Sequence, residues 1–400
     1  MRRLIHSIAM AAILCLAVFC GCSNDDQTGN SEPVIQSITA SNLNPGPAET
    51  ITFTCEAADA DGDDLSYAWT ANDVAIGVDA ASIQWQAPAV NGSITISVEV
   101  SDGTASTSRS LVLRNEFFLL TAVTDLHLSA CATNWIQPPT YVFAHRTELY
   151  IVDLRSALTF QTGHIEGAHN VPLAALTDSV GTYSNGQDVA VVCDTGQISA
   201  FAAMGLRMLG FEAFCMKWGM AGWNDISLMA GPWDSGISNQ YSTVMSNNAS
   251  PNLPVNDWPT LHTGLSSGQA VLEARVAAIF AEGYSPNVIT AYEVMDNPGS
   301  FHIHNYWMNQ DYEDIGHIAG SYQLTPGTLT TDRDLSALNP TQTNVLYCWT
   351  GQTSSFFGFY LNVLGYDLVS LRFGANALMH DDLTQERWEH QGHNYPYVTN

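Results

Sequence analysis

Basic residues are scarce in this chain of 400 residues, which has 12 Lys+Arg against 39 Asp+Glu and a formal net charge of −27 at pH 7. Lysine occurs once, as Lys217. A surface this acidic repels nucleic acid and anionic lipid headgroups, so we expect no nucleic-acid partner. The balance is typical of a protein kept soluble by its charge, and it leaves cationic partners open.

Long apolar runs are missing beyond the N-terminus, where no stretch reaches the ~18 uninterrupted apolar residues of a spanning helix. Residues 1–21 differ, with a basic start, an apolar stretch and small residues, as in a secretion signal. Gly21 before Cys22 resembles a bacterial lipoprotein processing site. That resemblance implies a lipid anchor on Cys22, residues 22–33 as a tether, and an outer-membrane location on its periplasmic or outer face. A plain signal peptide and a short membrane anchor are the alternatives.

Cysteine is too sparse for a disulfide scaffold, since Cys55, Cys131, Cys193, Cys215 and Cys348 are the thiols beyond the signal segment and Cys22. An odd number leaves at least one thiol free. A disulfide between Cys131 and Cys215 stays open, because geometry decides it. The histidines of residues 379–396 fit no tight metal signature, which favours a polar tail. We expect no metal and no cofactor, with calcium at the acidic residues 59–64 as the open alternative.

Residues 34–115 alternate apolar and polar side chains in short runs such as "ETITFTCEA" and "SITISVEVSDG", separated by Gly, Pro and Asp. This pattern predicts a small β-sandwich. The stretch "DADGDDLSYAWT", with Trp69 where a sandwich buries a tryptophan, resembles PKD and other immunoglobulin-like modules of bacterial surface proteins. The resemblance implies a spacer domain.

Residues 116–235 predict an α/β domain. "LYIVDLRS" and "DVAVVC" are apolar runs typical of buried parallel strands, and "SAFAAMGLRMLG" has helical spacing. Residues 236–262 are rich in Ser, Asn and Pro, which predicts a linker. The pattern then returns in residues 263–400 with "FHIHNYW" and "TNVLYC". The chain is therefore predicted to be multidomain, a β-sandwich followed by two α/β domains.

A cysteine loop closes one strand in each copy, "VVCDTGQISA" at 191–200 and "LYCWTGQTSS" at 346–355. Open α/β sheets bind ligands at such strand ends. Loop N–H groups and a following helix N-terminus favour a thiolate, so both cysteines are candidate nucleophiles. We expect the two glutamines to hydrogen-bond a sulfur ligand. The loops comprise Cys193, Asp194, Thr195, Gly196, Gln197, Ile198 and Ser199, and Cys348, Trp349, Thr350, Gly351, Gln352, Thr353 and Ser354.

Together with "GHIEGA" (163–168), "GHIAGS" (316–321) and "KWGMAGW" (217–223), the first copy resembles the rhodanese family, and the second is a diverged copy. The resemblance covers roughly residues 116–400. It implies two rhodanese-like domains and sulfur transfer through a cysteine persulfide, with a sulfane sulfur donor and a thiol acceptor as partners. It also implies supporting roles for Asp153, Arg155, His164 and His317.

The loops depart from the family pattern. Sulfurtransferases of this family usually place Arg or Lys five residues after the cysteine, where this chain has Ile198 and Thr353. Asp194 adds a negative charge beside Cys193, which hinders thiolate formation. Two hypotheses therefore stand. One is a sulfurtransferase or persulfide carrier in which Cys193 takes a sulfane sulfur, with Cys348 as a second site or a vestige. The other is a catalytically degenerate surface lipoprotein that binds or assembles an outer-membrane redox or secretion complex.

Overall fold

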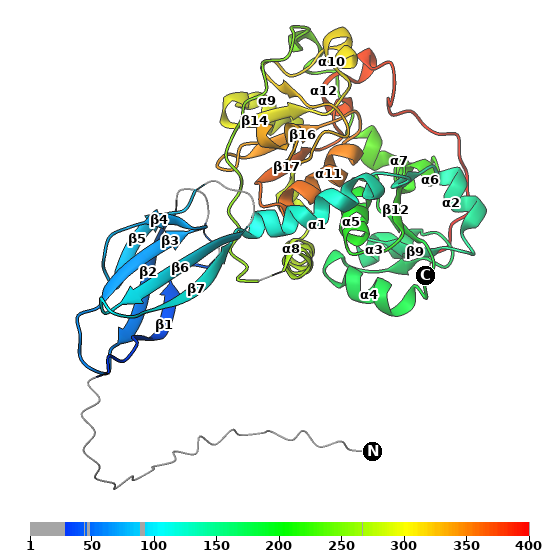
Figure 1. Ribbon diagram of the computed structural model, residues 1–400. Helices are drawn as coiled ribbons and strands as arrows, with labels where there is room; N and C mark the ends of the chain where they lie inside the picture. The colour runs from blue at the N-terminus through cyan, green and yellow to red at the C-terminus, as the bar shows by residue number, and fades with distance from the viewer. Residues whose placement is uncertain (1–28, 44, 46–48, 89–92, 266, 400) are drawn as a thin grey trace, which may run out of the picture.

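The computed structural model describes residues 29–399 apart from 44, 46–48, 89–92 and 266. The expected signal segment, Cys22 and most of the tether lie outside the described residues. Figure 1 shows an elongated N-terminal part joined to two α/β units that lie side by side. No helix in the described part of the chain combines the length and apolar character needed to cross a membrane.

Residues 34–114 form two antiparallel sheets with one core between them. The alternating pattern puts Phe53 from one sheet and Trp69 from the other into that core, with ring centroids 6.0 Å apart. Cys55 is a buried free thiol there. The sheets are ordered β1 (Val34–Ala40), β2 (Thr50–Ala58), β5 (Ser82–Gln86), and β4 (Val74–Ile76), β3 (Ser66–Ala71), β6 (Ser93–Ser101), β7 (Ser106–Arg114).

The acidic turn after β2 is held by its own hydrogen bonds. Asp59 Oδ1 accepts the backbone N–H groups of Asp61 at 2.7 Å and Gly62 at 3.0 Å. The carboxylates of Asp59, Asp61 and Asp63 lie within 4.8 Å of one another. These bonds account for the turn by themselves, as expected of Asp in tight turns.

The first α/β unit is built on five parallel strands. Its central strands are buried on both faces because helices cover the sheet on both sides. The strand order is β10 (His169–Asn170), β9 (Tyr150–Asp153), β11 (Val189–Val192), β12 (Ala213–Met216), β8 (Ile136–Gln137). The helices are α1 (Glu116–Cys131), α2 (Pro139–His145), α3 (Ala157–Thr162), α4 (Leu176–Tyr183), α5 (Gln197–Met208), α6 (Met220–Trp223) and α7 (Ser227–Asp234).

The second α/β unit repeats this strand order. Its parallel sheet runs β15 (Tyr322–Gln323), β14 (His302–Asn305), β16 (Asn344–Tyr347), β17 (Leu368–Leu371), β13 (Val288–Ile289). β16 therefore occupies the central place that β11 has in the first unit. The helices are α8 (Gly268–Glu282), α9 (Ala291–Asp296), α10 (Asn309–Ile315), α11 (Gln352–Val363) and α12 (Asn376–Met379).

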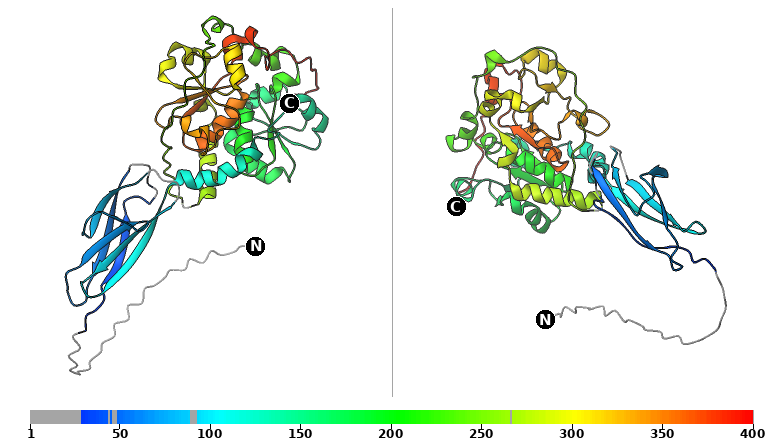
Figure 2. Two further views of the ribbon diagram at one scale, coloured as in Figure 1. Left: turned by 45° about the horizontal axis from the view of Figure 1, so that its top comes forward. Right: turned by 90° about the vertical axis from the view of Figure 1, so that its left-hand side faces the viewer.

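The two units share one hydrophobic core along helices α5 and α11, which follow the two cysteine loops. Phe201 of α5 meets Phe359 of α11 edge to face, with ring centroids 4.7 Å apart. Gly205 permits the close approach, because a β-carbon there would lie 2.6 Å from the Phe359 ring. Figure 2 shows the two units pressed together in both views.

The C-terminal segment is polar and largely exposed, as predicted for residues 379–396, and it also returns to the first unit. Its trace runs from the second unit back across the first (Figure 1). Val398 pairs with His164, and the Tyr395 ring stacks on Phe143 at 4.3 Å. Pro396 accepts a hydrogen bond from Trp223 Nε1 at 2.9 Å. A few apolar side chains among the polar ones thus attach this segment, which continues from the second unit, to the first unit.

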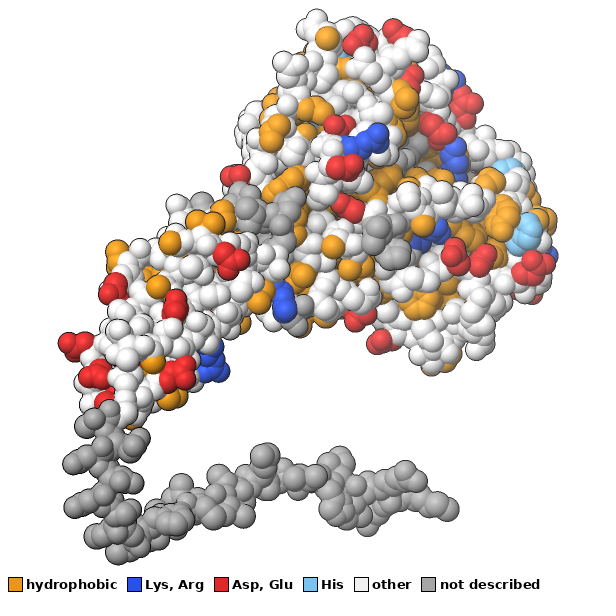
Figure 3. Space-filling view, in the orientation of Figure 1, with side chains coloured by type: hydrophobic (Ala, Val, Ile, Leu, Met, Phe, Trp, Pro, Cys, Tyr) orange, Lys and Arg blue, Asp and Glu red, His pale blue; other side chains and the backbone are white. Residues whose placement is uncertain are grey.

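Cys131 and Cys215 are both buried free thiols, which excludes the disulfide left open by the sequence. Each packs in the shared core as a small apolar side chain. The visible face carries scattered Asp and Glu and few Lys or Arg (Figure 3), as the composition requires.

Candidate functional site

Cys193 lies at the carboxyl end of β11, where the loop turns its backbone toward the sulfur. Its Sγ accepts hydrogen bonds from the N–H groups of Gly196 at 3.1 Å and Ser199 at 3.4 Å. The thiol donates to Ser199 Oγ at 3.4 Å. The positive φ of Gly196, 84°, lets the loop curl around the sulfur. The result is a cradle of N–H groups suited to an anion.

Cys348 has the corresponding place after β16. Its Sγ accepts the Ser354 N–H at 3.4 Å, and the thiol donates to Ser354 Oγ at 3.6 Å. Gly351 has a φ of 79°, close to that of its counterpart. The Ser354 hydroxyl also contacts Ser370 Oγ at 2.7 Å, which fixes its position. The repeated sequence thus gives a repeated local geometry.

Both sulfurs are closed off from solvent, since Cys193 and Cys348 are each 1% exposed. Burial raises the pKa of the Cys193 thiol, the Ser199 hydrogen bonds oppose that shift, and Asp194 adds to it. Burial also raises the pKa of Asp194 itself. The Cys193 thiol is therefore protonated near neutral pH in this closed arrangement, and a protonated thiol is a poor nucleophile.

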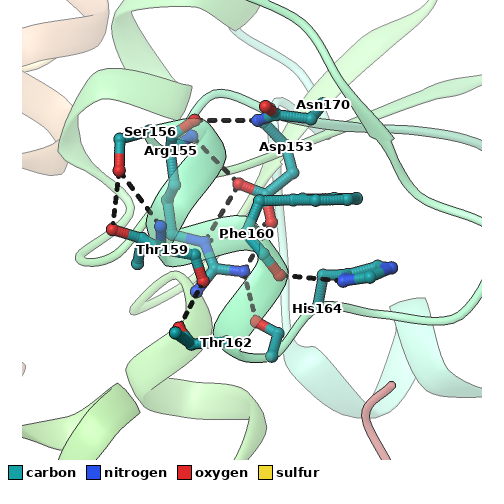
Figure 4. A network of polar contacts seen from close by, with 9 residues as sticks. Asp153, Arg155, Ser156, Thr159, Phe160, Thr162, His164 and Asn170 are labelled. Carbon is teal, nitrogen blue, oxygen red and sulfur yellow. Dashed lines mark hydrogen bonds and ion pairs between the residues drawn. The ribbon is translucent and has the colours of Figure 1, made fainter. Parts of the chain in front are cut away.

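Asp153 and Arg155 form a buried network of polar contacts (Figure 4), and Asp153 pairs with Val192, the residue before Cys193. The Arg155 guanidinium contacts Asp153 Oδ2 at 2.7 Å and donates to the Gly163 carbonyl at 2.7 Å. Asp153 is 1% exposed and Arg155 6%. The pair ties the end of β9 to the Gly-His turn. Arg155 is thus occupied and does not replace the cation missing from the cysteine loop.

The two motif histidines anchor their turns on the preceding helices. His164 Nδ1 contacts the Phe160 carbonyl at 2.9 Å, and its ring stacks on Phe160 at 3.7 Å (Figure 4). His317 Nδ1 contacts the Tyr312 carbonyl at 2.8 Å and stacks on that ring. Burial lowers the pKa of His317. Each histidine therefore positions its turn through a backbone contact and a ring stack.

The loop glutamines cross between the units, and their side-chain oxygens accept backbone N–H groups of the other unit. Gln197 Oε1 accepts the backbone N–H of Phe373 at 3.0 Å. Gln352 Oε1 accepts the backbone N–H of Trp218 at 3.4 Å. The two side chains are 2% and 1% exposed. Each cysteine loop thus bonds reciprocally to the segment that follows the neighbouring strand of the other unit.

Other loop residues have structural partners. Thr195 Oγ1 accepts a hydrogen bond from Gln197 Nε2 at 3.3 Å, and Thr350 Oγ1 accepts the Gln352 N–H at 3.2 Å. The Trp349 ring stacks on Trp307 at 4.0 Å. Asp194, Ile198 and Thr353 complete the two loops and bring no basic group.

An aromatic wall beside the first loop was missed in the sequence. Trp233 Nε1 donates to the Thr195 carbonyl at 3.1 Å. The Trp233 ring lies 5.0 Å from Trp218 and 5.3 Å from Trp388, between centroids. Trp388 comes from the returning C-terminal segment, so one face of the wall is contributed from more than 150 residues away, at a separation no local pattern reveals.

A comparison with protein-family models assigns a family to part of the first α/β unit. Residues 141–226 match the family model described as "Rhodanese-like domain", which confirms a rhodanese-like domain there. No curated protein matches this chain. The match spans only part of the chain and gives no assignment to the second unit.

Solved structures with similar parts include rhodanese-like and PKD proteins. A rhodanese-related protein from Thermoplasma volcanium is 22% identical, covering 21% of this chain and 83% of its own, with a TM-score of 0.20. A rhodanese-like domain protein from Staphylococcus aureus is 23% identical, covering 23% and 92%, with a TM-score of 0.21. The PKD1 domain of Vibrio anguillarum Epp is 21% identical, covering 22% and 96%, with a TM-score of 0.17. These likenesses each cover less than a quarter of this chain and carry no argument about its fold or activity.

Proposed function

We propose that the protein is a rhodanese-like sulfurtransferase or persulfide carrier in which Cys193 holds the transferred sulfur. The observation that supports this best is the pair of N–H groups, from Gly196 and Ser199, aimed at Cys193 Sγ. Fixed donors of this kind stabilise developing negative charge without reorganising. They would serve a thiolate and a persulfide alike, and they partly offset the missing loop cation.

In the proposed reaction the Cys193 thiol first gives its proton to water. The thiolate attacks the outer sulfur of a donor R–S–S⁻, the donor S–S bond breaks, and RS⁻ leaves with the electron pair. An acceptor thiolate then attacks the outer sulfur of the Cys193 persulfide and restores the Cys193 thiolate. The sulfane sulfur passes from thiolate to thiolate, so the cycle needs no external oxidant or reductant.

The other parts of the chain would support and anchor the first α/β unit. The second unit would be a diverged rhodanese-like domain with Cys348 as a second site or a vestige. The N-terminal sheets would be a PKD-like or immunoglobulin-like spacer. Lipidation at Cys22 would place the whole at the outer membrane.

A binding or assembly module is the second candidate. It is favoured by the closure of both sulfurs, each 1% exposed, and by the absence of a basic residue from both cysteine loops. With a net charge of −27, such a module would suit a basic partner in an outer-membrane complex.

Mass spectrometry of the full chain separates the two candidates. The protein is incubated with inorganic polysulfide or thiosulfate and digested, with Cys193→Ser as the matched control. We expect one added sulfur atom on the Cys193 peptide, removable by cyanide or a thiol, and none at that position in the serine variant. No added sulfur at Cys193, in protein whose Cys193 reacts with iodoacetamide, would favour the binding module.

A further inference from the structure

We infer that Gln352 and Gln197 are positioning residues that each α/β unit supplies to the other, holding both cysteine loops closed. We call residues 217–219 and 372–374 the first and second lips. Each lip follows the strand next to its cysteine strand and leads into α6 or toward α12. The effect of this closure on sulfur transfer rests on the proposed function, whereas the closure itself rests on geometry.

Gln352 touches both the lip and the loop of the first unit. Its Oε1 accepts the Trp218 N–H at 3.4 Å. Its amide group also packs on the Cys193 loop, because a β-carbon built at Gly196 would lie 2.0 Å from Gln352 Nε2. A single side chain of the second unit thus joins the first lip to the first cysteine loop.

Gln197 of the first unit makes the two corresponding contacts with the lip and the cysteine loop of the second unit. Its Oε1 accepts the Phe373 N–H at 3.0 Å. A β-carbon built at Gly351 would lie 2.8 Å from Gln197 Oε1. The contacts therefore occur twice with the units exchanged. The shared pattern Cys-x-Thr-Gly-Gln-x-Ser of the two loops accounts for this symmetry.

The first lip lies directly against the reactive loop. A β-carbon at Gly219 would come within 2.3 Å of the Cys193 carbonyl oxygen. The Met220 N–H, just beyond the lip, donates to the same oxygen at 2.8 Å. Movement of this lip away from the loop would therefore uncover the backbone next to the sulfur.

Both lips contain an aromatic residue in a conformation that bulky side chains avoid. Trp218 has a φ of 64° and Phe373 a φ of 62°. These are also the residues whose backbone N–H groups donate hydrogen bonds to the glutamine side chains. Such backbone strain persists only while its surroundings enforce it. Loss of the glutamine bond therefore favours release of the lip.

The opening that we infer is local, because separating the two units would expose their shared core at a high cost in free energy. Helices α5 and α11 share the core, where Phe201 and Phe359 meet with centroids 4.7 Å apart. Opening of a lip disturbs only the smaller aromatic cluster that holds Trp218 and Phe373 and leaves the core of α5 and α11 intact, so it costs less than separating the units.

Thiol alkylation in the full chain tests this inference without any sulfur donor. Iodoacetamide is added under native conditions and the rate at each cysteine is followed by peptide mass spectrometry. Gln352→Ala removes the side chain, and Gln352→Met keeps its length without the acceptor oxygen. Gln187→Ala is the control, an exposed glutamine that bonds the Glu148 carbonyl far from the lips.

In both Gln352 variants we expect Cys193 to be alkylated about fivefold faster, the effect of one net hydrogen bond on an opening equilibrium. Cys215, which is 0% exposed in the same unit, reports unfolding of that unit and keeps its wild-type rate. Gln197→Met is expected to accelerate Cys348 instead. If each glutamine only stabilised its own loop, its replacement would not accelerate alkylation of the cysteine in the other unit.

An unchanged Cys193 rate in both Gln352 variants would overturn the inference. So would equal acceleration of Cys193 and Cys215, since that marks unfolding of the unit. Faster alkylation of Cys193 with no sulfur loading would leave the closure by the glutamines standing and refute the proposed sulfur chemistry. The two ideas therefore fail separately.

Discussion

Replacing Arg155 by Met should destabilise the first α/β unit strongly, because it leaves a buried carboxylate alone. Asp153 is 1% exposed and is contacted by the guanidinium at 2.7 Å (Figure 4). Removing one partner of a buried ion pair costs about 4 kcal/mol, mostly as the desolvation of the charge that remains. The Gly163 carbonyl loses its 2.7 Å donor as well.

Urea unfolding of the full chain measures this cost if the probe belongs to the first unit. Alkylation of Cys215, which is 0% exposed, provides such a probe. At an m-value of about 2 kcal/mol per M, the loss lowers the midpoint by about 2 M urea. The control Arg387→Met, which breaks an exposed ion pair with Glu389, should leave the midpoint unchanged.

The double variant Asp153→Asn/Arg155→Met distinguishes the buried charge from the packing. The second unit already has Asn305 and Trp307 at the equivalent places, so a neutral pair is compatible with this fold. We expect the double variant to cost only about 1–2 kcal/mol, since no charge stays buried. A single variant that shifts the midpoint by less than about 0.5 M would refute the framework role of this pair.

Three further outcomes follow from contacts in the structure. Gly219→Ala should destabilise the first unit by about 2 kcal/mol, because its φ is 62° and the new methyl would lie 2.3 Å from the Cys193 carbonyl oxygen; thermal unfolding checks this. Gly205→Ala should also destabilise, since the methyl would lie 2.4 Å from an aromatic ring of α8, whereas Gly181→Ala in α4 has 3.9 Å of room and should be neutral or slightly stabilising. Burial lowers the pKa of His304 to about 3, so on acidification the unfolded state takes up the His304 proton before the folded state does. The free energy of unfolding should therefore decrease as the pH is lowered from about 6.5, by at most ~1.4 kcal/mol per pH unit. His304→Gln should flatten that slope in urea titrations between about pH 6.5 and 5, and an unchanged slope would count against it.

The features that the sequence predicted well are local ones. An apolar strand, a glycine that takes a positive φ and a following helix are neighbours in the chain, so "VVCDTGQISA" was enough to predict the loop around Cys193. The alternation in residues 34–115 likewise predicted paired antiparallel strands. Periodicity and turn chemistry act over a few residues, which is why these elements were accessible.

The features that the sequence did not reveal depend on distant partners. Gln352 and Trp218 are 134 residues apart, and nothing in either neighbourhood marks the other as its partner. The positive φ of Trp218 runs against the usual preference of an aromatic residue, so local reasoning argues against it. The return of Tyr395 to the first unit was hidden among polar neighbours. Tertiary packing decides such cases.

The most direct test of the account is the rate of sulfur loading at Cys193 in the wild-type chain and in Gln352→Met. Both proteins are treated with inorganic polysulfide, and the Cys193 peptide is followed by mass spectrometry over time. We expect one removable sulfur atom at Cys193 in both proteins, gained about fivefold faster in the variant. No sulfur at Cys193 in either protein, with iodoacetamide reaching that thiol in the variant, would contradict it.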